Sequence, residues 1–142
     1  MELPEEFWEW QIEKRKKGIK AMIKGKNIGY EAHLPVMATY GDKINLAVKG
    51  TGLVPKDEAI NFYIKECVAF IDKCKKKSWK KTTKKRLEFL LDLQSSPEDF
   101  DKSLISSIEM YGTKTFNNAK KNNKCSLMFN DYDYKTMISF QV

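Results

Sequence analysis

The chain has 142 residues, of which 42% are hydrophobic and 12% aromatic, which is enough to bury a core and excludes a wholly disordered chain. Its formal net charge of +7 favours partners that carry phosphate or other negative charge. No apolar run approaches the roughly 18 residues of a membrane span, and the opening stretch MELPEEFWEW is acidic. We therefore expect a cytoplasmic protein with no signal peptide and no contact with a membrane.

The first predicted element is an amphipathic helix from Leu3 to about Lys24. Its apolar residues fall on one broad arc at helical spacing, with Pro4 near the first turn and Gly25 just after the last. Trp10 lies outside this arc. Either another element covers its ring, or the ring is available for stacking on a ligand.

Residues 28 to 54 lack helical periodicity and predict two extended segments joined at Gly41-Asp42. A glycine in the first position of a two-residue turn is typical of a type II′ hairpin. Pro35 indicates an edge position or a bulge in the first strand. The alternating apolar residues of the second strand, expected on a half-buried face, are Ile44, Leu46 and Val48.

The helical period returns after Pro55, where Asp57 and Glu58 favour a helix start. The predicted helix runs for about twenty residues and ends in KCKKKS, where lysines complement the negative end of the helix dipole. The residues expected on its packed face are Ala59, Ile60, Tyr63, Ile64, Cys67, Phe70, Ile71 and Cys74.

Two more helices are predicted in the second half of the chain. The first begins at Ser78 as its cap and runs to about Gln94, with Trp79 on its packed side. The second begins with a cap at Ser96, a proline and two acids, and ends at Gly112. Its packed face is expected to hold Phe100, Leu104, Ile108 and Tyr111.

The last thirty residues predict a short helix and a second hairpin. Residues 113 to 123 are polar and basic and allow the helix, and the strands KCSLMFN and YKTMISFQV follow, joined by residues 131 to 133. The element order predicts one α+β domain spanning residues 1–142. In it, two antiparallel hairpins form one sheet, packed against an N-terminal helix and a central block of about three helices.

No motif in the sequence demands an enzyme. His33 is the only histidine, which excludes sites that need two. Glu31 and His33 are two apart on a predicted strand and could pair as acid and base, although two polar side chains on a solvated face are the more common case. No metal site is predicted. The cysteines, expected to be reduced, are Cys67, Cys74 and Cys125.

Two kinds of phosphate site are suggested by short segments. Lys49-Gly50-Thr51-Gly52 lies between a predicted strand and a proline-led helix, where backbone N–H groups can meet a phosphate. The segment from Thr113 to Lys124 offers several lysines and asparagines just ahead of a strand.

Lysines are concentrated in two segments, residues 73 to 86 and residues 114 to 124. The first, KCKKKSWKKTTKKR, holds nine basic residues and no acid. Only Arg15 and Arg86 among the 26 basic residues are arginines, so such surfaces would position a nucleic-acid backbone but read little sequence. The residues predicted to bind nucleic acid are Lys75, Lys76, Lys77, Lys80, Lys81, Lys84, Lys85, Lys120 and Lys121, with Trp10, Tyr132 or Tyr134 available to stack on a base.

Residues 114 to 127, KTFNNAKKNNKCSL, resemble a segment of the FMN-binding split-barrel family, the pyridoxamine phosphate oxidase-like proteins. The resemblance is carried by Lys114-Thr115, Asn118, Asn122 and Ser126-Leu127, and MISFQV is similar to that family's next strand. It implies FMN as a cofactor, with the flavin phosphate near Lys114 and Thr115 and with Asn118 in the same site.

Three hypotheses therefore remain open. The leading one is a small, non-catalytic module that binds a nucleic-acid backbone or another polyanion through its lysines and needs no cofactor. The alternatives are an FMN-binding split-barrel-like protein, and an inhibitor or immunity-type factor that docks on an acidic protein. The sequence indicates no oligomeric state.

Overall fold

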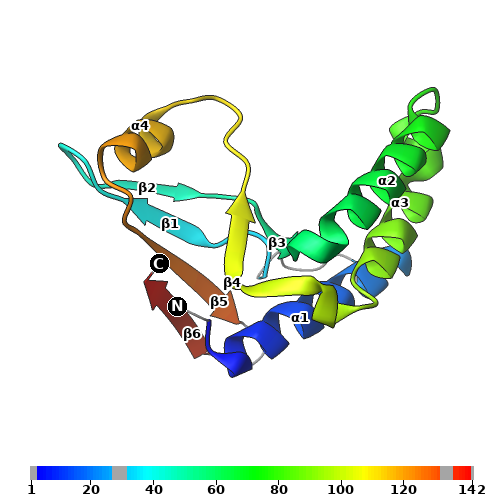
Figure 1. Ribbon diagram of the computed structural model, residues 1–142, viewed down its shortest axis with the longest axis horizontal. Coiled ribbons are helices and arrows are strands. Elements are labelled where there is room, and N and C mark those ends of the chain that lie inside the picture. Colours follow the sequence, from blue (N-terminus) through cyan, green and yellow to red (C-terminus); the bar gives the residue numbers. More distant parts are fainter. Residues whose placement is uncertain (1–2, 27–31, 132–135, 142) are drawn as a thin grey trace. The chain divides into compact units, whose positions relative to one another are not determined.

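The computed structural model describes residues 3–26, 32–131 and 136–141 (Figure 1). As predicted, the fold is α+β, with four α-helices, one 3-10 helix and six strands in the described residues. The chain forms two compact units: Met1–Gly29 with Leu53–Leu104, and Tyr30–Gly52 with Ile105–Val142. It passes between them inside β3 (Thr51–Pro55) and β4 (Phe100–Ser107), which pair as a two-stranded sheet. That the whole chain is one domain stays a prediction.

The N-terminal helix is confirmed as α1 (Glu5–Ile23). It ends in a left-handed glycine, Gly25, with φ of 74°. The N–H of Gly25 donates to the carbonyl of Met22, and the N–H of Lys26 donates to the carbonyl of Ala21. These two bonds form a Schellman motif, so the glycine has a structural reason to stand where the sequence places it.

The core of the first unit is built from aromatic and apolar side chains of three elements. Trp8 and Ile12 of α1 meet Tyr63 of α2 (Asp57–Cys74) and Phe100 of β4, each at most 8% exposed. The rings of Tyr63 and Phe100 lie 5.3 Å apart. Their burial is the main favourable contribution to the stability of this unit.

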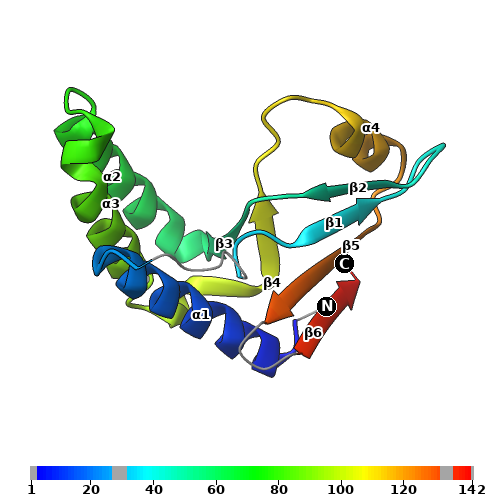
Figure 2. The same cartoon turned by 180° about the vertical axis from the view of Figure 1, so that it is seen from behind.

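The two central helices are confirmed as α2 and α3 (Trp79–Leu93), with Ser78 at the cap position of α3. They lie side by side in Figures 1 and 2, and the rings of Phe70 and Phe89 stack with centroids 4.1 Å apart. Helix α3 also packs along α1. The expected packed face of α2 is covered only in part, because Ile60, Ile64 and Ile71 are 37–56% exposed.

The helix predicted from Ser96 to Gly112 is wrong. A short 3-10 helix, η1 (Pro97–Asp99), is followed by strand β4. The apolar residues taken as a helical face include Phe100, Leu104 and Ile108, four apart. A spacing of four also keeps residues on one face of a strand, so this pattern does not distinguish a helix from a strand. The segment is a strand because it pairs with β3.

The second unit contains the predicted sheet of two antiparallel hairpins, in the order β2-β1-β5-β6. Its strands are β1 (Val36–Thr39), β2 (Asn45–Val48), β5 (Cys125–Asp131) and β6 (Thr136–Gln141). Thr39 pairs with Asn45 in the first hairpin and with Cys125 across the sheet. The predicted short helix is confirmed as α4 (Lys114–Lys121), which packs on β1 and β2 (Figure 1).

Three details of the first hairpin differ from the prediction. Gly41 does not adopt positive φ and residues 40–44 link the strands, so the turn is not a two-residue type II′ turn. Pro35 precedes a central strand, where its missing N–H costs no ladder bond. The face expected to be half-buried is solvent-exposed, by 62–69% at Ile44, Leu46 and Val48.

In the part of the chain that the structure describes, no helix combines the length and apolar character needed to cross a membrane.

Replacing Tyr63 by phenylalanine tests the core of the first unit. The Tyr63 hydroxyl donates to Oδ2 of Asp99 at 3.0 Å, so we expect the variant to lose about 1 kcal/mol of unfolding free energy at neutral pH. Burial and the bond to Asp99 raise the pKa of Tyr63 to about 12. The folded protein therefore holds this proton more tightly than the unfolded chain, and the contribution falls as pH rises from about 10 towards 12.

Urea unfolding at several pH values measures this difference between wild type and Tyr63→Phe. The two proteins differ at residue 63 alone, so contributions from all other groups cancel in the comparison. A difference that stays constant or grows between about pH 10 and pH 12 would contradict the assignment.

Candidate nucleic-acid interface

The first lysine-rich segment forms the end of the α2–α3 hairpin. We call this surface the basic end; it consists of Lys73, Lys75, Lys76, Lys77, Lys80, Lys81, Lys84 and Lys85, all exposed. The segment places the last turn of α2, a four-residue connection and the first two turns of α3 at one end of the first unit (Figure 1). Every lysine predicted here is therefore at the surface.

The lysines of the basic end stand at helix ends of opposite polarity. Lys73 is in the last turn of α2, where a cation complements the negative end of the helix dipole. Lys80 and Lys81 are in the first turn of α3, where the dipole is positive. That turn contains no acid, and Ser78 makes no side-chain capping bond. Folding thus explains the lysines of α2 but not those that begin α3.

Few carboxylates lie beside these lysines. Lys75 Nζ is 2.8 Å from Oδ1 of Asp72, and Lys84 Nζ is 3.9 Å from Oε1 of Glu88. Among the described residues the structure gives no ion pair to Lys76, Lys77, Lys80, Lys81 or Lys85. The positive charge of the basic end is therefore largely uncompensated by neighbouring acids.

Packing fixes which side of α3 carries its lysines. Thr82 is 2% exposed, and its hydroxyl bonds back to the carbonyl of Ser78 at 3.2 Å. Trp79, Thr82 and Arg86 share one side of the helix by their spacing. Of the lysines on the exposed surface of the helix, Lys80 and Lys84 lie opposite Thr82, while Lys81 and Lys85 lie on one flank. We call these four lysines the lysine ridge.

The sequence prediction that Trp79 is packed is wrong, since this residue is 67% exposed. The guanidinium carbon of Arg86 lies 4.5 Å from the ring centroid, within the range of a cation–π contact. Nε of Arg86 donates to the hydroxyl of Thr82 at 2.9 Å, which holds the guanidinium over the ring. Wheel periodicity gives the side of the helix on which Trp79 lies, but not whether another element covers that side at residue 79.

The aromatic residues first expected to stack on a base are not better placed. Trp10 is half-buried and stacks on Phe7, with ring centroids 5.8 Å apart. Tyr132 and Tyr134 lie outside the described residues. Trp79 is therefore the aromatic residue that the described structure places within a lysine-rich segment and largely open to solvent.

The second lysine-rich segment belongs to the other unit and is more strongly engaged with its surroundings. Lys121 Nζ lies 2.8 Å from Oδ2 of Asp42, and this bond holds the pKa of the Asp42 carboxyl below its usual value. Lys120 Nζ lies 4.4 Å from the ring centroid of Phe116. Lys120 and Lys121, both predicted to bind nucleic acid, thus already have partners within their own unit.

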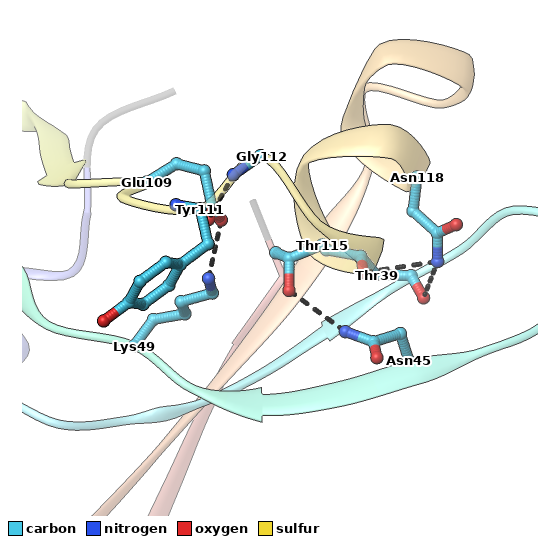
Figure 3. A network of polar contacts seen from close by, with 8 residues as sticks. All are labelled: Thr39, Asn45, Lys49, Glu109, Tyr111, Gly112, Thr115 and Asn118. Carbon is cyan, nitrogen blue, oxygen red and sulfur yellow. Dashed lines mark hydrogen bonds and ion pairs between the residues drawn. The ribbon is translucent and has the colours of Figure 1, made fainter.

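The residues implied by the flavin resemblance tie α4 to the first hairpin (Figure 3). The hydroxyl of Thr115, a residue 8% exposed, accepts a bond from Nδ2 of Asn45 at 3.0 Å. Nδ2 of Asn118 donates to the carbonyl oxygen of Thr39 at 3.2 Å (Figure 3). It also donates to the carbonyl oxygen of Lys43 at 3.1 Å.

Asn118 also explains a glycine in the hairpin. A Cβ at Gly41 would collide with its side-chain oxygen. A cavity of about 430 Å³ lies beside this contact, with Lys114, Lys121 and Asn45 in its lining. This cavity has room for a small anion.

The predicted phosphate loop at residues 49–52 has a different structural context. It does not lead into a helix, because β3 intervenes before α2. Lys49 Nζ lies 2.6 Å from Oε2 of Glu109, and Oε1 accepts bonds from the backbone N–H groups of Tyr111 and Gly112 (Figure 3). The bond from Lys49 is the largest cause of a lowered pKa at Glu109. Lys49 therefore anchors the segment after β4.

The remaining sequence candidates contribute no assembled site. His33 is half-buried, while its proposed partner Glu31 lies outside the described residues. The cysteines carry no disulfide, and Cys74 is buried. Within residues 3–26, 32–131 and 136–141, no group of three or more His, Cys, Asp or Glu side chains could hold a metal ion.

No family model, curated protein or solved structure matches this chain.

Iodide quenching of tryptophan fluorescence tests the electrostatics of the basic end. Trp8 is 3% exposed and Trp79 is 67% exposed, so Trp79 should account for most of the quenching. The lysines should concentrate iodide near Trp79 and repel caesium. We therefore expect the ratio of iodide quenching to acrylamide quenching to exceed the ratio of caesium quenching to acrylamide quenching.

The matched variants are Trp79→Phe, which should remove most of the iodide effect, and Lys80→Gln with Lys81→Gln, which should reduce it. At about 1 M ionic strength, where the Debye length is about 3 Å, the preference for iodide should disappear. Equal quenching by iodide and caesium at low salt would show that the field around Trp79 is not positive.

Proposed function

We propose that this protein is a non-catalytic module that binds the backbone of nucleic acid through the basic end of the α2–α3 hairpin. The observation that carries the proposal is the pair Lys80 and Lys81 at the positive end of α3. Each costs stability against the helix dipole, typically 0.3–1 kcal/mol for an exposed charge. Residues that break a local folding rule without a compensating contact are typical of functional surfaces.

A phosphate at the basic end would remove this conflict. It would meet the first-turn N–H groups of α3 together with the lysine ridge, and both attract an anion. The ridge repeats at one helical turn, with Lys80 followed by Lys84 and Lys81 by Lys85, and one helical turn rises about 5.4 Å. Successive phosphates of a single strand can follow such a spacing without any contact to base edges.

The chemistry of lysine and the exposure of Trp79 define the kind of nucleic acid expected. Lysine is a hydrated point charge without the bidentate geometry of arginine, so binding should be strongly salt-dependent and nearly independent of sequence. The ring of Trp79, 67% exposed and two residues after Lys77 in the sequence, offers a stacking surface for an unpaired base. We therefore favour single-stranded nucleic acid over duplex.

The test is the salt dependence of binding to a fluorescent oligonucleotide, single-stranded and duplex, measured by anisotropy. If about five phosphates are neutralised, log K should fall with a slope of roughly 3.5 to 4.5 against log salt. Replacing all four ridge lysines, Lys80, Lys81, Lys84 and Lys85, by glutamine should reduce the slope by about three.

The matched control replaces four exposed lysines elsewhere in the first unit, Lys20, Lys24, Lys26 and Lys65, by glutamine. It changes the net charge equally, so a specific site predicts little loss in the control. Equal losses in both variants would reduce the effect to net charge and contradict the proposed surface. Binding to an acidic protein such as poly-glutamate, but to neither oligonucleotide, would favour the interaction-factor hypothesis instead.

FMN binding is a second candidate, favoured by the cavity of about 430 Å³ beside Lys114 and Lys121. A flavin phosphate there would meet two ammonium groups and the side chain of Asn117. Titration of FMN in a calorimeter should then show saturable heat, and Lys114→Ala should weaken binding about tenfold, as expected for one lost charge-assisted bond. Asn123→Ala, outside the cavity lining, serves as the control. Absence of heat at millimolar FMN contradicts this candidate.

A further inference from the structure

Helix α2 carries an exposed apolar row that the first unit leaves uncovered. Ile60 is 37% exposed, Ile64 54%, Val68 53% and Ile71 56%. Their spacings of four, four and three residues keep them on one line along the helix. The row adjoins the buried side of α2, which holds Tyr63 and Cys74.

The two ends of this row carry opposite charges. Asp57 lies three residues before Ile60, and Lys75 lies four residues after Ile71, so both continue the same line. Asp57 is exposed, and the side chain of Lys75 is 58% exposed. The α2 seam, as we call it, thus runs from an acid through four apolar side chains to a base.

We propose that the α2 seam binds the same seam of a second copy of this chain, with the two helices antiparallel about a twofold axis. With the axis beside residue 66, Asp57 of one copy faces Lys75 of the other, and Ile64 faces Val68. In this register Ile60 lies opposite position 72, next to Ile71 of the other copy. A twofold axis requires a surface to be complementary to itself, and the seam satisfies this because its charges reverse with its direction.

The charges of the seam specify a second copy rather than another apolar partner. An antiparallel pair forms the Asp57–Lys75 contact twice and opposes the two helix dipoles favourably. A parallel pair would bring Asp57 against Asp57 and Lys75 against Lys75. Lys75 already bonds Asp72 on its own helix, at 2.8 Å, so pairing exchanges one exposed carboxylate for another.

The seam involves one helix from each copy, which is small compared with the roughly 800 Å² per partner of stable complexes. We therefore expect a weak dimer, with a dissociation constant in the micromolar range or above. The seam shares Lys75 with the basic end, but its test measures association of the chain with itself in the absence of nucleic acid, so this inference does not rest on the nucleic-acid proposal.

Sedimentation velocity of the full chain, from about 1 to about 500 µM, measures the expected dimer. Ile64→Lys should raise the dissociation constant at least about tenfold. Phe62→Lys is the matched control, since Phe62 is 59% exposed on the other flank of α2 and should leave the constant unchanged. Both positions are exposed, so neither substitution should unfold the protein, and circular dichroism checks this.

A charge reversal tests the orientation of the pair. Asp57→Lys and Lys75→Glu should each weaken the dimer, by about three- to tenfold because each change affects two symmetric contacts. The double variant, Asp57→Lys with Lys75→Glu, should regain most of the wild-type affinity. A chain that is monomeric throughout the concentration range, or a dimer that survives Ile64→Lys, overturns the proposal. Lack of rescue in the double variant overturns the antiparallel register.

Discussion

The rotation of α3 about its own axis is the constraint on which the proposed surface depends. Thr82 is buried at 2% exposure, and Phe89 stacks on Phe70 of α2. With that side turned inward, helical periodicity puts the lysine ridge on the solvent side. The same rotation leaves Trp79 at the border of the packed face, where the bond from Arg86 to Thr82 holds a guanidinium over its ring. Apolar packing thus orients the charges.

Much of the fold could be predicted from local patterns, because the helices and hairpins are specified by residues close in sequence. The caps Ser78 and Gly25, and the period of α1, α2 and α3, needed no tertiary information. The segment around β4 could not be assigned this way, since apolar residues four apart fit both a helix and a strand. Alternation in β2 likewise indicated a strand but not which face the rest of the unit would cover.

The candidate site was predictable as a concentration of charge and not as a geometry. The density of basic residues in the sequence identified the segment from Lys73 to Lys85. The environment of each lysine, however, depends on the helix end at which it lies. In the second unit, the asparagine and threonine residues that resemble a flavin-binding segment form hydrogen bonds to other residues of the same unit. Asn118 closes the hairpin loop and Thr115 meets Asn45. A pattern of hydrogen-bonding residues cannot by itself distinguish bonds to a ligand from bonds to the chain.

The α2–α3 hairpin brings the negative end of α2 and the positive end of α3 to the same end of the first unit, and each dipole acts mainly on the charges within its own terminal turn. The helix dipole stabilises a lysine at the end of α2 and destabilises a lysine at the start of α3. The sum of the two effects is small, so repulsion among the lysines remains. Only Asp72 and Glu88 reduce it among the described neighbours. An anion at the basic end therefore relieves a repulsion that the folded state alone must bear, because the unfolded chain spreads these charges apart. Binding is then linked to stability. Because relief of the repulsion is part of the binding free energy, high salt should weaken both the affinity for a polyanion and the stabilisation that the polyanion gives.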